Sequence, residues 1–141
     1  MIGYLLDTSG LWQLLRVPAL LAVWADRIAA GALRVCEPSR AEFLYSAAGP
    51  AHRDELADEL DTMCALAPVP KNAWRWVESA QYKLTQREQH RGPGLIDLLV
   101  CATAVHHDLT VLHVDADFGT VARVLPELRQ RDIRSAITDS S

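Results

Sequence analysis

Residues 94–118, GLIDLLVCATAVHHDLTVLHVDADF, contain a helix pattern followed directly by a strand pattern. Residues 95–105 are apolar on every side with a single charge, which predicts a helix packed on most of its circumference. Residues 110–114 include three β-branched residues and predict a strand. Asp115-Ala116-Asp117-Phe118 then leads into a further helix to about residue 128. Buried strands that alternate with helices are typical of an α/β fold with a parallel sheet.

The same alternation extends toward both ends of the chain. Residues 2–6 predict a buried strand that ends at Asp7-Thr8-Ser9, residues 33–36 predict a second strand, and a last strand is expected near Ile133. Helices are predicted at residues 11–15, 18–30, 41–48 and 52–66, and from Asn72 to the loop at residues 91–94. This order predicts a parallel sheet covered by helices on both faces.

Length and composition restrict the class of protein. A chain of 141 residues, half of them hydrophobic, can bury one core but not two ordinary ones, so we expect a single domain over residues 1–141. With a formal charge of −4, any nucleic acid must be bound through a local basic patch or through cations held by carboxylates. Three cysteines in apolar stretches indicate core thiols of a reducing compartment. No stretch fits a membrane helix or a signal peptide, so we expect a cytoplasmic protein with no membrane contact.

Acidic residues follow two of the predicted strands. Asp7 ends the strand at residues 2–6, and Asp115 ends the strand at residues 110–114. In open parallel sheets the ligand crevice lies beyond the carboxyl ends of the strands, near the point where strand order reverses. A turn or a helix cap would also explain either acid alone, but their recurrence at two strand ends favours a functional site.

Two further acids stand in helical segments. Asp97 lies in the apolar run at residues 95–105, where an ionised carboxylate is costly to bury without compensation. The alternative is an acid in the first helical turn after Gly94, favoured by the helix dipole. Glu42 is a single acid in an apolar setting, and its alternative is a capping box with Ser39.

Together these acids predict a metal site. Carboxylates crowded in one cleft repel each other unless divalent cations neutralise them, and no Lys or Arg lies within three residues of Asp7, Asp97 or Asp115. Oxygen ligands of this kind select Mg²⁺ or Mn²⁺ rather than zinc. Such a site suits phosphodiester hydrolysis. A transition-metal site built on His106, His107 and His113 lacks any zinc-type spacing.

The acidic pattern resembles that of the PIN-domain ribonucleases, specifically the VapC toxins of VapBC toxin-antitoxin pairs. The resemblance rests on Asp7 in YLLDTSGLW, Glu42 in SRAEFLYSA, and Asp97, Asp115 and Asp117 in residues 94–118, and it covers nearly the whole chain.

The resemblance implies a three-layer α/β/α PIN fold, usually a homodimer. It implies that Asp7, Glu42, Asp97 and Asp115 hold Mg²⁺ or Mn²⁺ and form the catalytic set. Asp117 matches the second acid of a D-x-D element, which in the family either joins the metal site or supports it from outside. It further implies an endoribonuclease that acts on structured RNA such as tRNA or rRNA, inhibited by a VapB antitoxin.

Candidate substrate-binding residues lie near the acids or on a basic helix face. Thr8 and Ser9 could donate hydrogen bonds to a metal ligand or phosphate, although Ser9 is also explained as a helix cap. Arg87 and Arg91 follow Lys83 at intervals of four residues, which fits either phosphate contact or a solvated helix face.

Two other functions, and a surface for a partner, also fit parts of the sequence. A PIN-like module that binds RNA or protein without catalysis is one alternative. A haloacid-dehalogenase-type phosphatase is another, but it needs a second acid two residues after Asp7, where this chain has Ser9. For an antitoxin helix, the amphipathic stretch at residues 52–66 and the aromatics around Trp74 offer an apolar groove. An antitoxin Arg or Lys could pair with the acids in place of a metal.

Overall fold

The central sheet is parallel throughout. The computed structural model describes residues 2–135. Five strands pair in the order β3-β2-β1-β4-β5, and each neighbouring pair is parallel. The strands are β1 (Tyr4–Leu6), β2 (Leu33–Val35), β3 (Ala65–Leu66), β4 (Thr110–His113) and β5 (Gln130–Asp132).

The strand order places a ligand crevice at the middle of the sheet. β1 lies at the centre, with β2 and β3 on one side and β4 and β5 on the other. Tyr4 is opposite Leu33 of β2 and opposite Thr110 of β4, so the carboxyl ends of these strands meet at one edge. Because strand order reverses at β1, the crevice beyond Leu6 and β4 is where a ligand site is expected.

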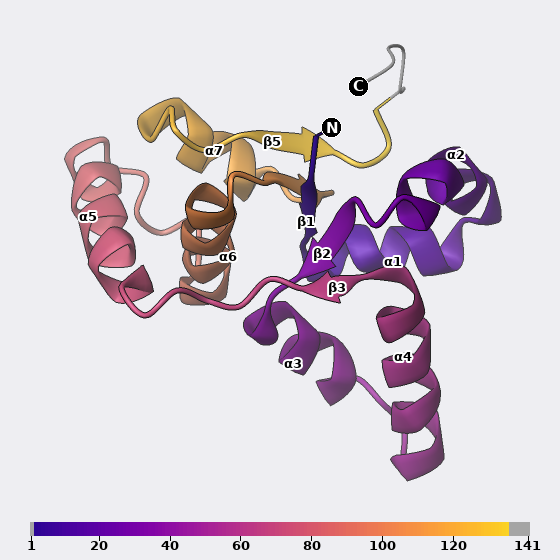
Figure 1. The fold of residues 1–141 in the computed structure, drawn as a ribbon. Coiled ribbons are helices and arrows are strands. Elements are labelled where there is room, and N and C mark those ends of the chain that lie inside the picture. The colour runs from indigo at the N-terminus through magenta and orange to yellow at the C-terminus, as the bar shows by residue number, and fades with distance from the viewer. Residues whose placement is uncertain (1, 136–141) are drawn as a thin grey trace.

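Helices cover both faces of the sheet, as Figure 1 shows for α5, α6 and α7 on one side and α1 and α2 on the other. The arrangement is a three-layer α/β/α fold, which confirms the predicted fold class. The helices are α1 (Thr8–Arg16), α2 (Pro18–Ala29), α3 (Glu37–Tyr45), α4 (Pro50–Met63), α5 (Ala73–Gln86), α6 (Leu95–His107) and α7 (Asp117–Val124).

Alternate residues of the central strands feed two separate apolar cores. Leu5 and Val111 pack into the core shared with α5, α6 and α7. Tyr4 and Leu6 point the other way, into a core that includes Trp24 and residues of α1, α3 and α4. A strand that is buried on both faces has no polar positions, which is why residues 4–6 form an uninterrupted apolar run.

α1 lies unusually close to β4. A Cβ atom placed on Gly10 would be 2.7 Å from the carbonyl oxygen of Leu112, which is closer than a carbon can approach. Glycine at this position therefore lets the helix that begins after Asp7 rest directly on the neighbouring strand. This close packing helps hold the carboxyl ends of β1 and β4 together.

Several predicted boundaries need correction. The helix predicted at residues 41–48 begins at Glu37, because Pro38 fits the first turn of a helix and Cys36 occupies the N-cap position. The helix predicted at residues 52–66 ends at Met63, and the chain then adds the short strand β3 at the sheet edge. The last helix ends at Val124, before Pro126, rather than near residue 128. The strand expected near Ile133 is β5, which ends one residue earlier.

Two composition-based predictions can be examined in the described residues. Cys36, Cys64 and Cys101 are all buried and free, as expected for core thiols. Between residues 2 and 135, no helix combines the length and the apolar character that crossing a membrane requires.

Candidate functional site

The structure brings three carboxylates together at the carboxyl edge of the sheet. Asp97 stands in the first turn of α6, Asp115 lies between β4 and α7, and Asp117 is the first residue of α7. One carboxylate oxygen from each residue lies within 4.8 Å of the others. We call these three residues the acidic group.

Asp97 is the most strongly perturbed member of the group. Its Oδ2 accepts a hydrogen bond of 3.2 Å from the backbone N–H of Gly94, so it closes the first turn of α6. Burial raises the pKa of Asp97 to about 6, and the charges of Asp7, Asp115 and Asp117 act in the same direction. The carboxyl group therefore titrates close to neutral pH when no cation is bound.

Asp115 and Asp117 are linked through the turn that begins α7. Asp115 Oδ1 accepts the backbone N–H of Asp117 at 2.9 Å. Partial burial and the charge of Asp115 both raise the pKa of Asp117. A Cβ atom on Gly92 would lie 3.0 Å from Asp117 Oδ1, so the loop between α5 and α6 passes directly beside the acidic group.

Asp7 lies behind the acidic group and is more deeply buried. It is the N-cap of α1, and its Oδ2 accepts the backbone N–H of Ser9 at 3.1 Å and the Ser9 hydroxyl at 2.7 Å. Burial raises the pKa of Asp7, and the two bonds from Ser9 partly offset that rise. Asp7 is not one of the three residues with oxygens within 4.8 Å, but its charge acts on Asp97.

Ser9 joins the two central strands at this edge. While its hydroxyl donates to Asp7, the same oxygen accepts the backbone N–H of Val114 at 3.0 Å. Ser9 is inside α1 and is not its cap, because Asp7 fills that position. Thr8 is buried and its hydroxyl donates to the carbonyl of Ser39 at 3.5 Å, so it faces the protein interior.

Glu42 is exposed on α3 and lies outside the acidic group. Its charge contributes to the raised pKa of Asp7, which places the two side chains within electrostatic reach of each other. The alternative of a capping box between Ser39 and Glu42 is wrong, because α3 begins earlier and Ser39 is buried inside it.

The two candidate arginines do not share a helix face. α5 ends at Gln86, so Arg87 is its C-cap residue and Arg91 lies in the following loop. The interpretation of Lys83, Arg87 and Arg91 as one helical stripe is therefore wrong. Both arginines are exposed, and Arg91 is next to Gly92, which adjoins the acidic group.

The sequence did not single out His113 as a support for the acids. It is buried at the end of β4, it contacts the backbone of Asp115, and it is not a member of the acidic group. Its position at the end of the predicted strand, two residues before Asp115, was the available signal.

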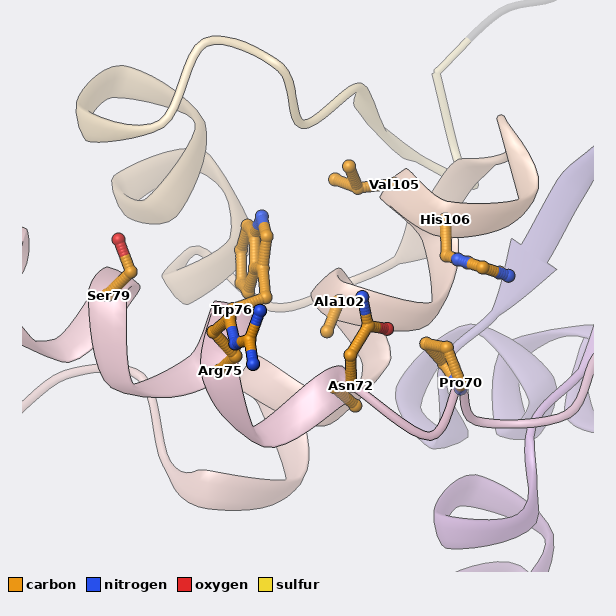
Figure 2. A pocket seen from close by; sticks show the side chains of 9 residues that line it. Pro70, Asn72, Arg75, Trp76, Ser79, Ala102, Val105 and His106 are labelled. Atoms are coloured by element: carbon orange, nitrogen blue, oxygen red, sulfur yellow. The ribbon is translucent and has the colours of Figure 1, made fainter.

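A pocket of about 330 Å³ lies away from the acids, between α5 and the C-terminal half of α6 (Figure 2). Trp76 lines it, and the buried indole Nε1 of Trp76 has no hydrogen-bond partner among residues 2–135. None of the clustered carboxylates contributes to this pocket, so the chemistry of the site does not depend on it.

The acidic group has the chemistry of a site for a hard cation. All of its donors are carboxylate oxygens, which suit Mg²⁺ or Mn²⁺ and not a soft metal. Burial raises the pKa values of Asp97 and Asp117, and repulsion by the neighbouring carboxylates raises them further. A bound divalent cation would remove that repulsion.

Comparison with known proteins decides the family. The PIN domain family matches residues 4–124 of the chain. The chain belongs to the PIN-domain family. This PIN domain is 40% identical over 110 residues to Ribonuclease VapC6 of Mycobacterium tuberculosis. The alignment covers 78% of this chain and 87% of that protein. It is 35% identical over 130 residues to Ribonuclease VapC2 of the same species, with 91% of each covered.

Solved structures show the same fold. VapBC from Salmonella typhimurium bound to DNA aligns with a TM-score of 0.74 at 13% identity, covering 94% of this PIN domain and 99% of that chain. VapBC-1 from nontypeable Haemophilus influenzae gives a TM-score of 0.74 at 14% identity, covering 96% and 100%. Membership of the PIN family confirms the resemblance found in the sequence and removes the phosphatase alternative.

Proposed function

We propose that the protein is an endoribonuclease toxin of the VapC type that hydrolyses phosphodiester bonds in cellular RNA such as tRNA or rRNA. The observation that supports this most directly is the acidic group at the strand-order switch point of a PIN domain. Similarity to proteins named as VapC ribonucleases supports RNA as the substrate. On this proposal residues 1–141 act as a single domain in the cytoplasm.

The proposed cofactor is Mg²⁺ or Mn²⁺, held by Asp97, Asp115 and Asp117, with Asp7 behind them. Such a cation, when bound, lowers the pKa of a bound water and neutralises charge on the phosphoryl oxygens. The two hydrogen bonds from Ser9 hold the Asp7 carboxylate in place beside this proposed metal site. The catalytic set is then Asp7, Asp97 and Asp115 with Glu42.

On this proposal, a carboxylate accepts the proton of the attacking water. Asp97 is one candidate, because it belongs to the acidic group and burial raises its pKa, which increases its affinity for a proton. Glu42 is the other, because it is exposed and lies outside the group that would ligate the cation. Substitution of each by Gln or Asn, with metal affinity measured separately, distinguishes a base from a ligand.

RNA would approach over the loop between α5 and α6. Arg87 and Arg91 are exposed on this segment, and Gly92 brings it into contact range of Asp117. Arginines at the rim of an acidic site can hold the phosphates on either side of the scissile bond. Ser9 and Thr8 are directed to protein atoms and would act on substrate only through Asp7 and the backbone.

A VapB-type antitoxin is the proposed partner, with a homodimer as the proposed assembly. Two solved structures that share the fold are of VapBC. Two apolar surfaces could receive a partner helix: one where Leu15 and Leu21 meet Met63 of α4, and one around Trp74. The acidic residues Asp58 and Glu59 border the first surface and would attract a basic partner segment.

Sequencing of new RNA 5′ ends after brief expression tests the proposal. The intact protein should generate new ends at defined sites, and Asp115→Asn should abolish them while circular dichroism stays unchanged. Asp54→Asn is the matched control, because Asp54 is exposed on α4 and away from the acidic group. Equal cleavage by wild type and Asp115→Asn would refute the metal-nuclease proposal, and no cleavage by either would favour a binding module without catalysis.

A further inference from the structure

A buried histidine lies immediately behind the acidic group. His113 is the last residue of β4 and is only 5% exposed. Its Nδ1 accepts the backbone N–H of Asp115 at 3.0 Å, and its Nε2 lies 2.6 Å from Oε1 of Gln130 on β5. The ring of Phe118 packs against the imidazole at 4.9 Å between centroids.

These contacts define one tautomer of the imidazole. A backbone N–H can only donate, so Nδ1 of His113 must be unprotonated. The proton is then on Nε2, from which it is donated to the side-chain oxygen of Gln130. Phe118 fixes the plane of the ring, so both hydrogen bonds are directed by packing as well as by chemistry.

The hydrogen bond reaches the acids through the backbone. His113 anchors the N–H of Asp115, and the Oδ1 of Asp115 in turn accepts the N–H of Asp117. A rotation of the Asp115 peptide would therefore move both carboxylates that the β4–α7 turn supplies to the acidic group. Residues that orient metal ligands in this way influence affinity although they do not touch the ion.

We infer that His113 is a positioning residue for the acidic group, acting through its Nδ1 acceptor on the Asp115 backbone and held in its tautomer by Gln130. The inference rests on the proposed function insofar as it assigns the acidic group to a divalent cation. The hydrogen bond itself exists independently of any metal, so it can be tested separately.

Two substitutions of His113 separate positioning from core packing. His113→Leu keeps apolar volume but removes the acceptor, whereas the side-chain oxygen of Asn in His113→Asn can occupy the place of Nδ1. We expect His113→Leu to weaken Mn²⁺ binding, measured by titration calorimetry on the full chain, by about tenfold or more, and His113→Asn to restore most of the loss.

A histidine elsewhere in the chain serves as the matched control. His52 Nδ1 accepts the backbone N–H of Ala48 at 2.9 Å, which is the same kind of bond at the start of α4. His52→Leu should leave Mn²⁺ affinity unchanged. Equal affinity in wild type and His113→Leu, or an equal loss in His113→Leu and His113→Asn, would overturn the inference.

Nuclear magnetic resonance of the wild-type protein tests the bond without metal. A scalar coupling across the hydrogen bond between the Asp115 amide nitrogen and His113 Nδ1, with the proton on Nε2, is expected. A ring protonated on Nδ1 would overturn the inference, even if His113→Leu failed to fold. If wild type shows the coupling but binds no Mn²⁺, the proposed metal site fails while the hydrogen bond stands. If it binds Mn²⁺ without the coupling, only the role of His113 fails.

Discussion

Asp97→Asn should stabilise the metal-free protein at neutral pH. Asp97 has the same shape as Asn, and an Asn oxygen can still accept the N–H of Gly94. The substitution therefore removes a charge from a half-buried site where Asp7, Asp115 and Asp117 already repel it. Loss of a residue proposed to be essential for activity should thus increase the free energy of unfolding.

The sign and size of this effect follow from the pKa shift. The pKa of Asp97 rises from 3.8 to about 6 on folding, so the native state binds more protons than the unfolded state between these values. Stability contributed at this site is present below pH 3.8 and is lost as pH rises to about 6. At about 1.4 kcal/mol per pKa unit the upper limit is about 3 kcal/mol.

Two effects make the expected stabilisation by Asp97→Asn smaller than this upper limit. Solvent reaches part of the carboxyl group and screens it, which leaves about 1–2 kcal/mol. The favourable interaction of an ionised Asp97 with the start of α6 is also lost, at a cost of about 0.5 kcal/mol. The net gain for Asp97→Asn is about 1 kcal/mol, which corresponds to an increase in melting temperature of about 3 °C.

Urea denaturation of wild type and Asp97→Asn across acid and neutral pH, with chelator present, measures the difference directly. The two proteins should be equally stable below about pH 4, and the variant should gain stability as pH rises to neutral. Asp132→Asn is a control of opposite sign, because Arg134 lowers the pKa of Asp132. Asp132 therefore contributes stability above its unfolded pKa, and that stability is lost as pH falls through its folded pKa.

A difference between wild type and Asp97→Asn that does not change with pH would refute this reasoning. Addition of millimolar Mg²⁺ or Mn²⁺ should reverse the order of stability, since an ion that binds only the native state stabilises it by mass action. Wild type should then gain more than the variant. A melting temperature of wild type that is indifferent to both ions would count against a shared carboxylate site.

Three further substitutions test contacts around the site. Ser9→Ala should raise the pKa of Asp7 further, which is measured from the carbon-13 resonance of its carboxyl group. It should also lower the free energy of unfolding by about 1–3 kcal/mol, because the N–H of Val114 loses its acceptor. Gly10→Ala should destabilise the protein by about 1–3 kcal/mol in urea, because the new Cβ meets backbone. Gly119→Ala, which meets only ordinary contact in helix α7, should be neutral or stabilising by up to about 1 kcal/mol.

The main features of the fold could be predicted because they depend on short-range patterns. Residues 4–6 and 110–113 are buried on both faces, as expected for central strands of a parallel sheet. Their carboxyl ends must then lie at one edge, so acids that follow them are expected to converge. Asp115 could be placed there from the sequence alone, whereas its distance from Asp97 could not, because that distance depends on how α6 packs on the sheet.

The incorrect predictions come from tertiary effects on weak local signals. The pair Ser39 and Glu42 has the spacing of a capping box, but a proline at residue 38 starts the helix one turn earlier and moves Ser39 into the core. β3 consists of Ala65 and Leu66 alone, which is too short to leave a pattern. It forms only because β2 offers an open edge at Arg34 and Val35.

Helix capping and the proposed metal-binding role are compatible for these acids. Asp7 caps α1, Asp97 closes the first turn of α6, and Asp117 begins α7. The start of a helix carries partial positive charge, which favours a nearby carboxylate by up to about 1 kcal/mol. Three helix starts directed at one edge therefore offset part of the repulsion in the acidic group before any cation binds. A residue that satisfies its helix with one oxygen, as Asp97 does with Oδ2, keeps the other free for a ligand. The alternatives of a helix cap for Asp7 and of a first-turn acid for Asp97 were therefore correct, and these helix starts supply a means by which the proposed metal site can exist in a folded, metal-free protein.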